Sequence, residues 1–233
     1  IYGEQLRYQD MGYDLWSVTT GVYTGMRGIL PPIQRYIYLY IPLITMGLMS
    51  REYQSGSIKL LYSSPVKNTS IIMGKFLSMM VYGVVLIGVL GVFVIFSAIT
   101  IVNFDYPLVL SGMLGLYLLI LAYSAIGLFM SSITKYQVVA AIGTLAVLAV
   151  LNFIGDVGQD YDLVRHITYW LSITGRAYPF IDGLVASNNI FYFLIVIGFF
   201  LALSILKLNT EKTIMPLKIK VLKYSGIIFV ILL

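Results

Sequence analysis

The sequence predicts an all-α fold, a bundle of helices that cross a membrane several times. Of the 233 residues, 59% are hydrophobic and only 11% are charged, whereas roughly 25% are charged in an average soluble domain. The mean hydropathy is +0.91. A soluble fold cannot hide so much apolar surface, because even a large domain leaves about a quarter of its chain surface in water. The composition therefore indicates an integral membrane protein and excludes disordered, disulfide-bonded and collagen-like chains.

The spacing of the charged residues divides the chain into five apolar segments. A bilayer core of about 30 Å needs roughly 20 apolar residues per helix. Complete spans are expected near residues 32–50, 76–102, 107–130, 137–155 and 189–206. The first is the shortest, but Pro32 suits an initial helical turn and the Arg35 side chain can reach the interface. A sixth span is expected to begin at Tyr224 and to be cut off at Leu233, as in a fragment of a longer membrane protein.

Lysine and arginine predict the orientation in the membrane. Residues 51–75, Lys135 and residues 207–223 carry ten basic residues and two acidic ones, whereas acidic residues prevail on the other side. The positive-inside rule places the lysine-rich loops in the cytoplasm, which is consistent with a multi-pass protein of the bacterial inner (cytoplasmic) membrane. The basic net charge thus reflects topology and gives no indication of nucleic-acid binding. The two external segments are residues 1–31 and 156–188.

The cytoplasmic segment 51–75 predicts a short amphipathic helix. Gly56 permits a sharp turn after the first span, and Ser57 occupies a position from which a helix can be capped. Three apolar residues at helical spacing then form one face: Ile58, Leu61 and Tyr62. Pro65 ends this helix, and the polar residues 68–70 start the next span. Two interpretations remain open, a helix that only anchors the loop and a docking surface for a cytoplasmic partner.

Several short motifs of this segment resemble the signature of the membrane subunits of type 2 ABC exporters. They are Arg51-Glu52, Gly56-Ser57-Ile58-Lys59-Leu60-Leu61, Ser63-Ser64-Pro65-Val66 and Gly74-Lys75-Phe76. Lys59 departs from the pattern, because many members have an acidic residue there. The motifs Tyr178-Pro179-Phe180, Gly183-Leu184 and Tyr192-Phe193-Leu194 are similar to the gliding-motility-like permease branch.

This resemblance implies the permease half of an ATP-driven exporter, with six helices per subunit. Residues 1–31 would be the first external loop, residues 32–208 the permease domain (family helices two to six), and residues 209–233 a cytoplasmic linker with the start of an extra span. Residues 51–66 would couple to a separate ATP-binding subunit, through Glu52, Gly56, Ile58, Lys59, Leu61 and Pro65. A homodimer or a sister permease would complete the pathway within the membrane lipid.

The chain itself has no phosphate-binding loop. Such a loop needs Gly-x-x-x-x-Gly-Lys-Ser/Thr, whereas Gly74-Lys75 is followed by Phe76 and lacks the upstream glycine. We therefore expect no catalytic, metal or cofactor site in this chain, and we expect ATP and Mg²⁺ to be bound by the partner subunit.

The external segment 156–188 predicts an amphipathic helix with aromatic residues at the interface. Leu163, Ile167 and Trp170 recur at helical spacing, Gly175 is expected to end the helix, and Pro179 and Gly183 to break the chain again. The resemblance implies short re-entrant helices that form an external gate, with gate residues Leu163, Ile167, Trp170, Pro179 and Gly183. A loop lying on the membrane surface is the open alternative.

Other functional classes explain less of the sequence. Ion-coupled secondary transporters usually have ionisable groups at mid-membrane depth, and the predicted spans have almost none. An intramembrane protease needs histidine pairs or a serine with a base, but His166 is the single histidine and lies in an external loop. A membrane anchor or assembly protein that does not transport remains an open alternative.

Overall fold

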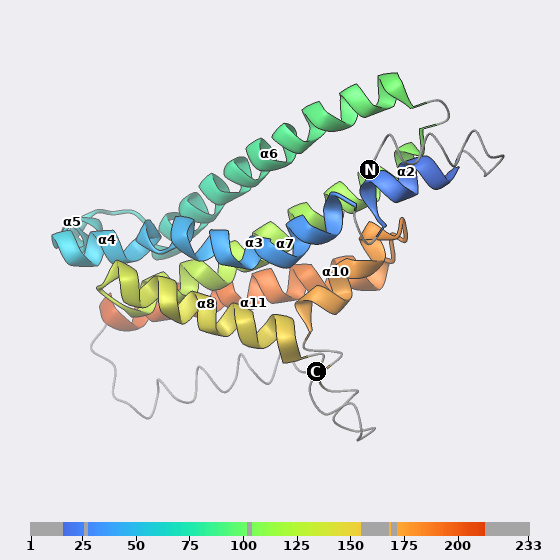
Figure 1. Ribbon diagram of the computed structural model, residues 1–233. Coiled ribbons are helices and arrows are strands. Elements are labelled where there is room, and N and C mark those ends of the chain that lie inside the picture. The colour runs from blue at the N-terminus through green and yellow to red at the C-terminus, as the bar shows by residue number, and fades with distance from the viewer. Residues whose placement is uncertain (1–15, 26–27, 102–103, 155–167, 169–171, 213–233) are drawn as a thin grey trace. The chain divides into compact units, whose positions relative to one another are not determined.

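The structure is a computed structural model that describes residues 16–25, 28–101, 104–154, 168 and 172–212 (Figure 1). Over these residues the fold is all-helical and contains no strand, which confirms the predicted fold class. The helices are, in chain order, α2 (Trp16–Tyr23), α3 (Leu30–Thr45), α4 (Gly47–Ser55), α5 (Ile58–Ser63), α6 (Asn68–Thr100), α7 (Tyr106–Ile133), α8 (Gln137–Phe153), α10 (Ile173–Ile181) and α11 (Ser187–Lys212).

Three of these helices are long and apolar enough to cross a membrane, namely α6, α7 and residues Ser187–Thr210 of α11. Helices occupy all five predicted positions, but the count of five complete spans is not confirmed. α8 has 17 residues and is therefore about 25 Å long at 1.5 Å per residue, shorter than the bilayer core. The span expected to begin at Tyr224 lies outside the described residues.

The segment expected to form a span over residues 32–50 is divided into two helices in the structure. α3 ends at Thr45 and α4 begins at Gly47. Pro42 lies inside α3 and has no N–H to donate to the preceding turn. The Thr45 hydroxyl donates to the Ile41 carbonyl at 2.9 Å, a contact that tends to bend helices. The first predicted span is therefore a pair of shorter helices.

The chain divides into two compact units, each of which contains parts of several helices. The first unit comprises residues 1–38, 81–120 and 149–190, and the second comprises residues 39–80, 121–148 and 191–233.

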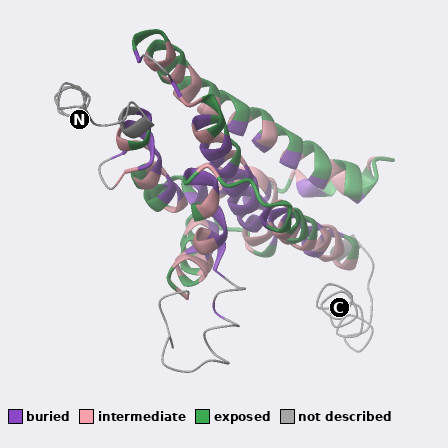
Figure 2. Cartoon of the chain, turned by 90° about the vertical axis from the view of Figure 1, so that its right-hand side faces the viewer, coloured by how far each residue is buried: buried purple, intermediate pink, exposed green. Residues whose placement is uncertain are grey.

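Figure 2 shows burial along the chain, with the exposed residues concentrated on α6 and the buried ones on α7.

In the first unit, α7 packs closely against α3 and α10. Gly112 lies against the Leu30 side chain and Gly115 against Phe180, so closely that a β-carbon at either glycine would collide. The Ser111 hydroxyl donates to the Phe180 carbonyl at 2.7 Å. Small residues of this kind let helices approach within a membrane. Not every glycine of the long helices is packed in this way, because Gly88 of α6 has nothing within 4 Å.

The described part of the external segment corrects the predicted break points. Gly175 and Pro179 lie inside α10 and do not interrupt it. The reason is a local cap, because the Ser172 hydroxyl accepts from the Gly175 N–H at 3.2 Å and starts the helix just before that glycine. Gly183 does break the helix as predicted, because it follows the end of α10 and has a left-handed φ of 85°. The helix predicted over Leu163 to Leu171 lies outside the described residues.

The second unit is organised around the part of α7 after residue 120. Its buried side chains include Ile41, Met49, Ile72, Phe76, Ile126 and Phe193. The Phe129 and Phe200 rings lie 5.8 Å apart between α7 and α11. Gly127 lies directly against Thr45, at the end of α3. This unit contains the 51–66 segment.

Candidate functional site

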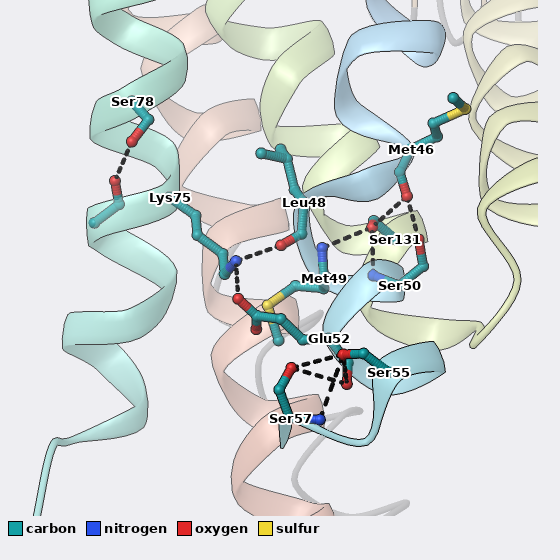
Figure 3. Close-up of polar contacts among 11 residues, drawn as sticks. Met46, Leu48, Met49, Ser50, Glu52, Ser55, Ser57, Lys75, Ser78 and Ser131 are labelled. Carbon is teal, nitrogen blue, oxygen red and sulfur yellow. Dashed lines mark hydrogen bonds and ion pairs between the residues drawn. The ribbon is translucent and has the colours of Figure 1, made fainter. Parts of the chain in front are cut away.

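The start of α4 is capped by a residue from another helix. Its own N-cap residue, Met46, makes no side-chain cap. Instead the Ser131 hydroxyl of α7 accepts from the Met49 N–H at 2.9 Å and the Ser50 N–H at 3.0 Å, and it donates to the Met46 carbonyl at 2.8 Å (Figure 3). These bonds satisfy backbone groups that a helix start leaves unpaired. One hydroxyl of α7 therefore fixes where α4 begins.

The turn between α4 and α5 is built as the sequence predicts. Gly56 has a φ of 76° and its N–H donates to the Tyr53 carbonyl at 3.4 Å. The hydroxyls of Ser55 and Ser57 lie 2.8 Å apart, and both donate to the Glu52 carbonyl, at 3.4 and 3.5 Å (Figure 3). Ser57 occupies the predicted N-cap position of α5 but makes no side-chain cap, since its hydroxyl bonds back toward α4.

Replacing Gly56 with alanine is expected to loosen the turn by about 1 kcal/mol, because a β-carbon disfavours the left-handed conformation. No atom lies within 4 Å of the added methyl group, so the effect isolates backbone strain. Hydrogen exchange of the Leu60 and Leu61 amides, which both donate to the Ser57 carbonyl, should accelerate about fivefold. Gly74→Ala is the matched control, since Gly74 is helical and also has open space around it. Equal exchange in both variants would contradict the role of Gly56.

The apolar face predicted for α5 is its least exposed side, because Ile58 is buried and Leu61 and Tyr62 are half-buried. Ile58 is 8% exposed and packs inside its own unit, while Leu60 is 73% exposed. Leu61 is half-buried and Lys59 is exposed. The resemblance assigns Ile58 to coupling, but its burial leaves Leu60 as the outward apolar side chain of the helix. Ser64 is extended, with ψ 147°, as required before Pro65.

An ion pair connects the two helices that flank the 51–66 segment. The Lys75 ammonium of α6 lies 2.6 Å from Glu52 Oε1 of α4 and also donates to the Leu48 carbonyl (Figure 3). The Glu52 side chain is 26% exposed and that of Lys75 is 21% exposed. The resemblance assigns Glu52 to coupling with a partner subunit, whereas in this unit its charge is already paired within the chain.

Two further side-chain contacts connect this region to other helices. The Asn68 amide at the start of α6 donates to Asn209 Oδ1 of α11 at 2.8 Å. Gln137 at the start of α8 donates to Gln54 of α4 at 3.4 Å. The helix pair α4–α5 is thus held by side chains from α6, α7 and α8.

The sequence analysis missed Ser131 and the role of Lys75. Ser131 is 82 residues from Met49, so no local pattern connects them. A signal for the ion pair did exist, because Glu52 is the single acidic residue of the segment 51–75 and an isolated acid among lysines favours a local partner.

Only two of the five residues predicted for the external gate lie among the described residues. Pro179 and Gly183 lie at the end of α10 in the first unit. Leu163, Ile167 and Trp170 lie outside the described residues, as does His166. Within the described part of the chain, no three His, Cys, Asp or Glu residues gather as metal ligands.

Comparison with known families identifies the class of protein. The model of the ABC-2 family transporter proteins matches residues 11–159, well over half of the chain. The chain therefore belongs to the ABC-2 transporter family, and it is a multi-pass membrane protein of the permease type that serves an ABC transporter. The matched region includes α4 and α5 and ends before α10 and α11. No match was found among the curated proteins or the solved structures.

Proposed function

We propose that this chain is the permease half of an ATP-driven exporter in the bacterial inner membrane, and that residues 51–66 receive force from a separate ATP-binding subunit. The observation that supports this proposal is the attachment of α4 and α5. They lie at the lysine-rich end of the spans, and α4 is joined to α6 by the Glu52–Lys75 ion pair and to α7 by Ser131. A push on α5 would reach both helices through these contacts.

The remaining parts of the proposal follow the family resemblance. The partner subunit would bind ATP and Mg²⁺, and a second copy of this chain or a sister permease would complete the pathway. Residues 32–208 would form the permease domain, residues 1–31 the first external loop, and residues 209–233 a linker to an extra span. The gliding-motility-like branch is the one that we propose for the chain.

The docking surface can be tested at its exposed apolar side chain. Placing a carboxylate in an apolar contact without a partner costs several kcal/mol, so Leu60→Asp should weaken recovery of the ATP-binding subunit about 100-fold. Ile58→Asp would be a poor test, because Ile58 is buried in its own unit. The measurement is the Mg²⁺-dependent ATPase activity that co-purifies with the tagged chain from native membranes.

Tyr136→Asp is the matched control. Tyr136 is also exposed, lies between α7 and α8, and is outside the 51–66 segment, so its replacement should leave the recovered ATPase unchanged. Equal recovery with Leu60→Asp would contradict docking through α5. Recovery of no ATPase with the unaltered chain, together with transport that depends on a proton gradient, would favour a secondary transporter.

A further inference from the structure

The first unit contains a cavity lined by polar and aromatic side chains, and Arg35 is the charged residue among the described residues of its lining. Its volume is about 550 Å³ and it lies where α3, α8 and the first turn of α10 come together. The described residues of its lining include Gln34, Arg35, Tyr38, Asn152, Thr174 and Tyr178. A volume of this size is in the range of small-molecule sites in proteins, about 300–1,000 Å³.

The polar groups on one side of the cavity are held in place by bonds between the three helices. The Gln34 amide, which is 3% exposed, donates to the Thr174 carbonyl at 3.1 Å. The Thr174 hydroxyl is bonded to the Asn152 side chain. Because these groups are fixed by each other, they present a preorganised polar surface to a ligand.

Arg35 is the charged group of the cavity. It is the one charged residue of α3. It lies near the start of that helix, about 7.5 Å along the axis from the first residue, Leu30, at 1.5 Å per residue. Among the described residues it has no ion-pair or hydrogen-bond partner, and none of the described residues that line the cavity carries a carboxylate. An arginine in this position favours an anion, and its planar guanidinium suits the two-oxygen contact that phosphate offers.

Aromatic side chains line the rest of the cavity. Tyr38 and Phe153 pack edge to face with ring centroids 6.2 Å apart, and Tyr36 and Tyr178 are more than half exposed beside them. Tyrosine rings with an apolar body and a polar tip suit the boundary between headgroups and acyl chains. The cavity therefore combines an anion-binding group with surroundings that accept an amphiphile.

We propose that this cavity binds the phosphate group of an anionic amphiphile, with Arg35 contacting the phosphate oxygens and the tyrosine rings flanking the adjoining apolar part. The phosphate belongs either to a membrane phospholipid or to a phosphate-bearing molecule that reaches the cavity from solution. The site does not rest on the proposed coupling through residues 51–66.

The experiment uses the purified full-length chain in a maltoside detergent and three probes. Dihexanoyl phosphatidic acid carries an anionic phosphate, dihexanoyl phosphatidylcholine has the same acyl chains without net charge, and inorganic phosphate has no apolar part. Binding is measured by the ligand-dependent rise in unfolding temperature. We expect saturable binding of phosphatidic acid, weakened at least tenfold by Arg35→Gln and less by Arg35→Lys, which keeps the charge but loses the planar contact.

Arg51→Gln is the control for diffuse charge, because Arg51 is also an exposed arginine but belongs to the second unit. Binding that depends on Arg35 and is restricted to phosphatidic acid would support an amphiphile. Equally tight, Arg35-dependent binding of inorganic phosphate would support the phosphate site with a soluble ligand. The proposal is overturned if phosphatidylcholine binds as tightly, if Arg35→Gln changes nothing, or if Arg51→Gln weakens binding as much. Unchanged unfolding temperatures without ligand would show that the variants are folded.

Discussion

Replacing Lys75 with methionine is expected to disconnect α4 from α6 and, under the proposed function, to lower the ATP-dependent activity of the complex. The substitution keeps the apolar stem of the side chain but removes the bonds to Glu52 and the Leu48 carbonyl. Bonds to a charged group contribute about 1.5–3 kcal/mol each, and the Glu52 carboxylate would be left partly buried without its partner. The 51–66 segment would then move independently of the helix that follows it.

The absence of cysteine in the chain makes this separation measurable by spin labels. Labels at Leu60→Cys and Ser78→Cys, both exposed positions of the second unit, should give a narrow distance distribution in the unaltered background and a broad one with Lys75→Met. In the purified complex with its ATP-binding subunit, stimulation of ATP hydrolysis by the permease should fall at least tenfold. Lys67→Met is the control, since Lys67 is an exposed lysine of the same segment without a described ion pair.

Exchanging the two charged residues tests whether the effect depends on the ion pair or on the lysine alone. Glu52→Lys combined with Lys75→Glu restores opposite charges but cannot restore the bond to the Leu48 carbonyl, so we expect partial recovery relative to either single variant. A narrow distance distribution and full ATPase stimulation in Lys75→Met would refute the mechanical role of the pair.

The second large effect is expected at Gly115. A β-carbon there would collide with the β-carbon and ring of Phe180, and because the obstacle lies close to the α10 backbone it cannot rotate away. Overpacking of this kind costs about 1–3 kcal/mol or more. Gly115→Val should therefore separate α10 from α7 and lower the unfolding temperature by several degrees.

Gly88→Val is the matched control for this substitution. Both glycines lie inside long apolar helices, so the change in helix propensity is the same, but nothing lies within 4 Å of Gly88. Similar unfolding temperatures for the two variants, measured in the same detergent, would show that α7 and α10 do not pack as described.

Hydropathy and local chemistry predicted the positions of the helices and the turn at Gly56. These features depend on residues that are close in sequence, such as an apolar run or a glycine that must adopt a positive φ. The break between Thr45 and Gly47 is only partly a local feature. Pro42 and the Thr45 hydroxyl precede it in α3, but the hydroxyl that caps the start of α4 belongs to Ser131 in another helix. The role of Ser172 was likewise missed. A glycine often marks the end of a helix, but the bond from the Gly175 N–H to the Ser172 hydroxyl places Gly175 in the first turn of α10.

In the candidate site, too, local features were predictable from the sequence and features that depend on tertiary packing were not. The amphipathic pattern of α5 correctly placed a short helix at residues 58–63, but periodicity does not show which side faces the chain's own core. Ile58 and Leu60 are both apolar, and tertiary packing decides that the first is buried and the second exposed. The coupling role of the segment remains a prediction.

The contrast between α6 and α7 has a consequence for biosynthesis. In α6 only 11% of the most apolar stretch is buried by the rest of the chain, whereas in α7 the share is 67%. A helix satisfies its own backbone in lipid, so α6 can be released into the bilayer as soon as it leaves the translocon. The neighbours of α7 include Phe180 and Phe200, which the ribosome adds after α7. Assembly of the bundle around α7 is therefore expected to follow translation of α10 and α11, and during that interval α7 depends on lipid or on an insertion chaperone.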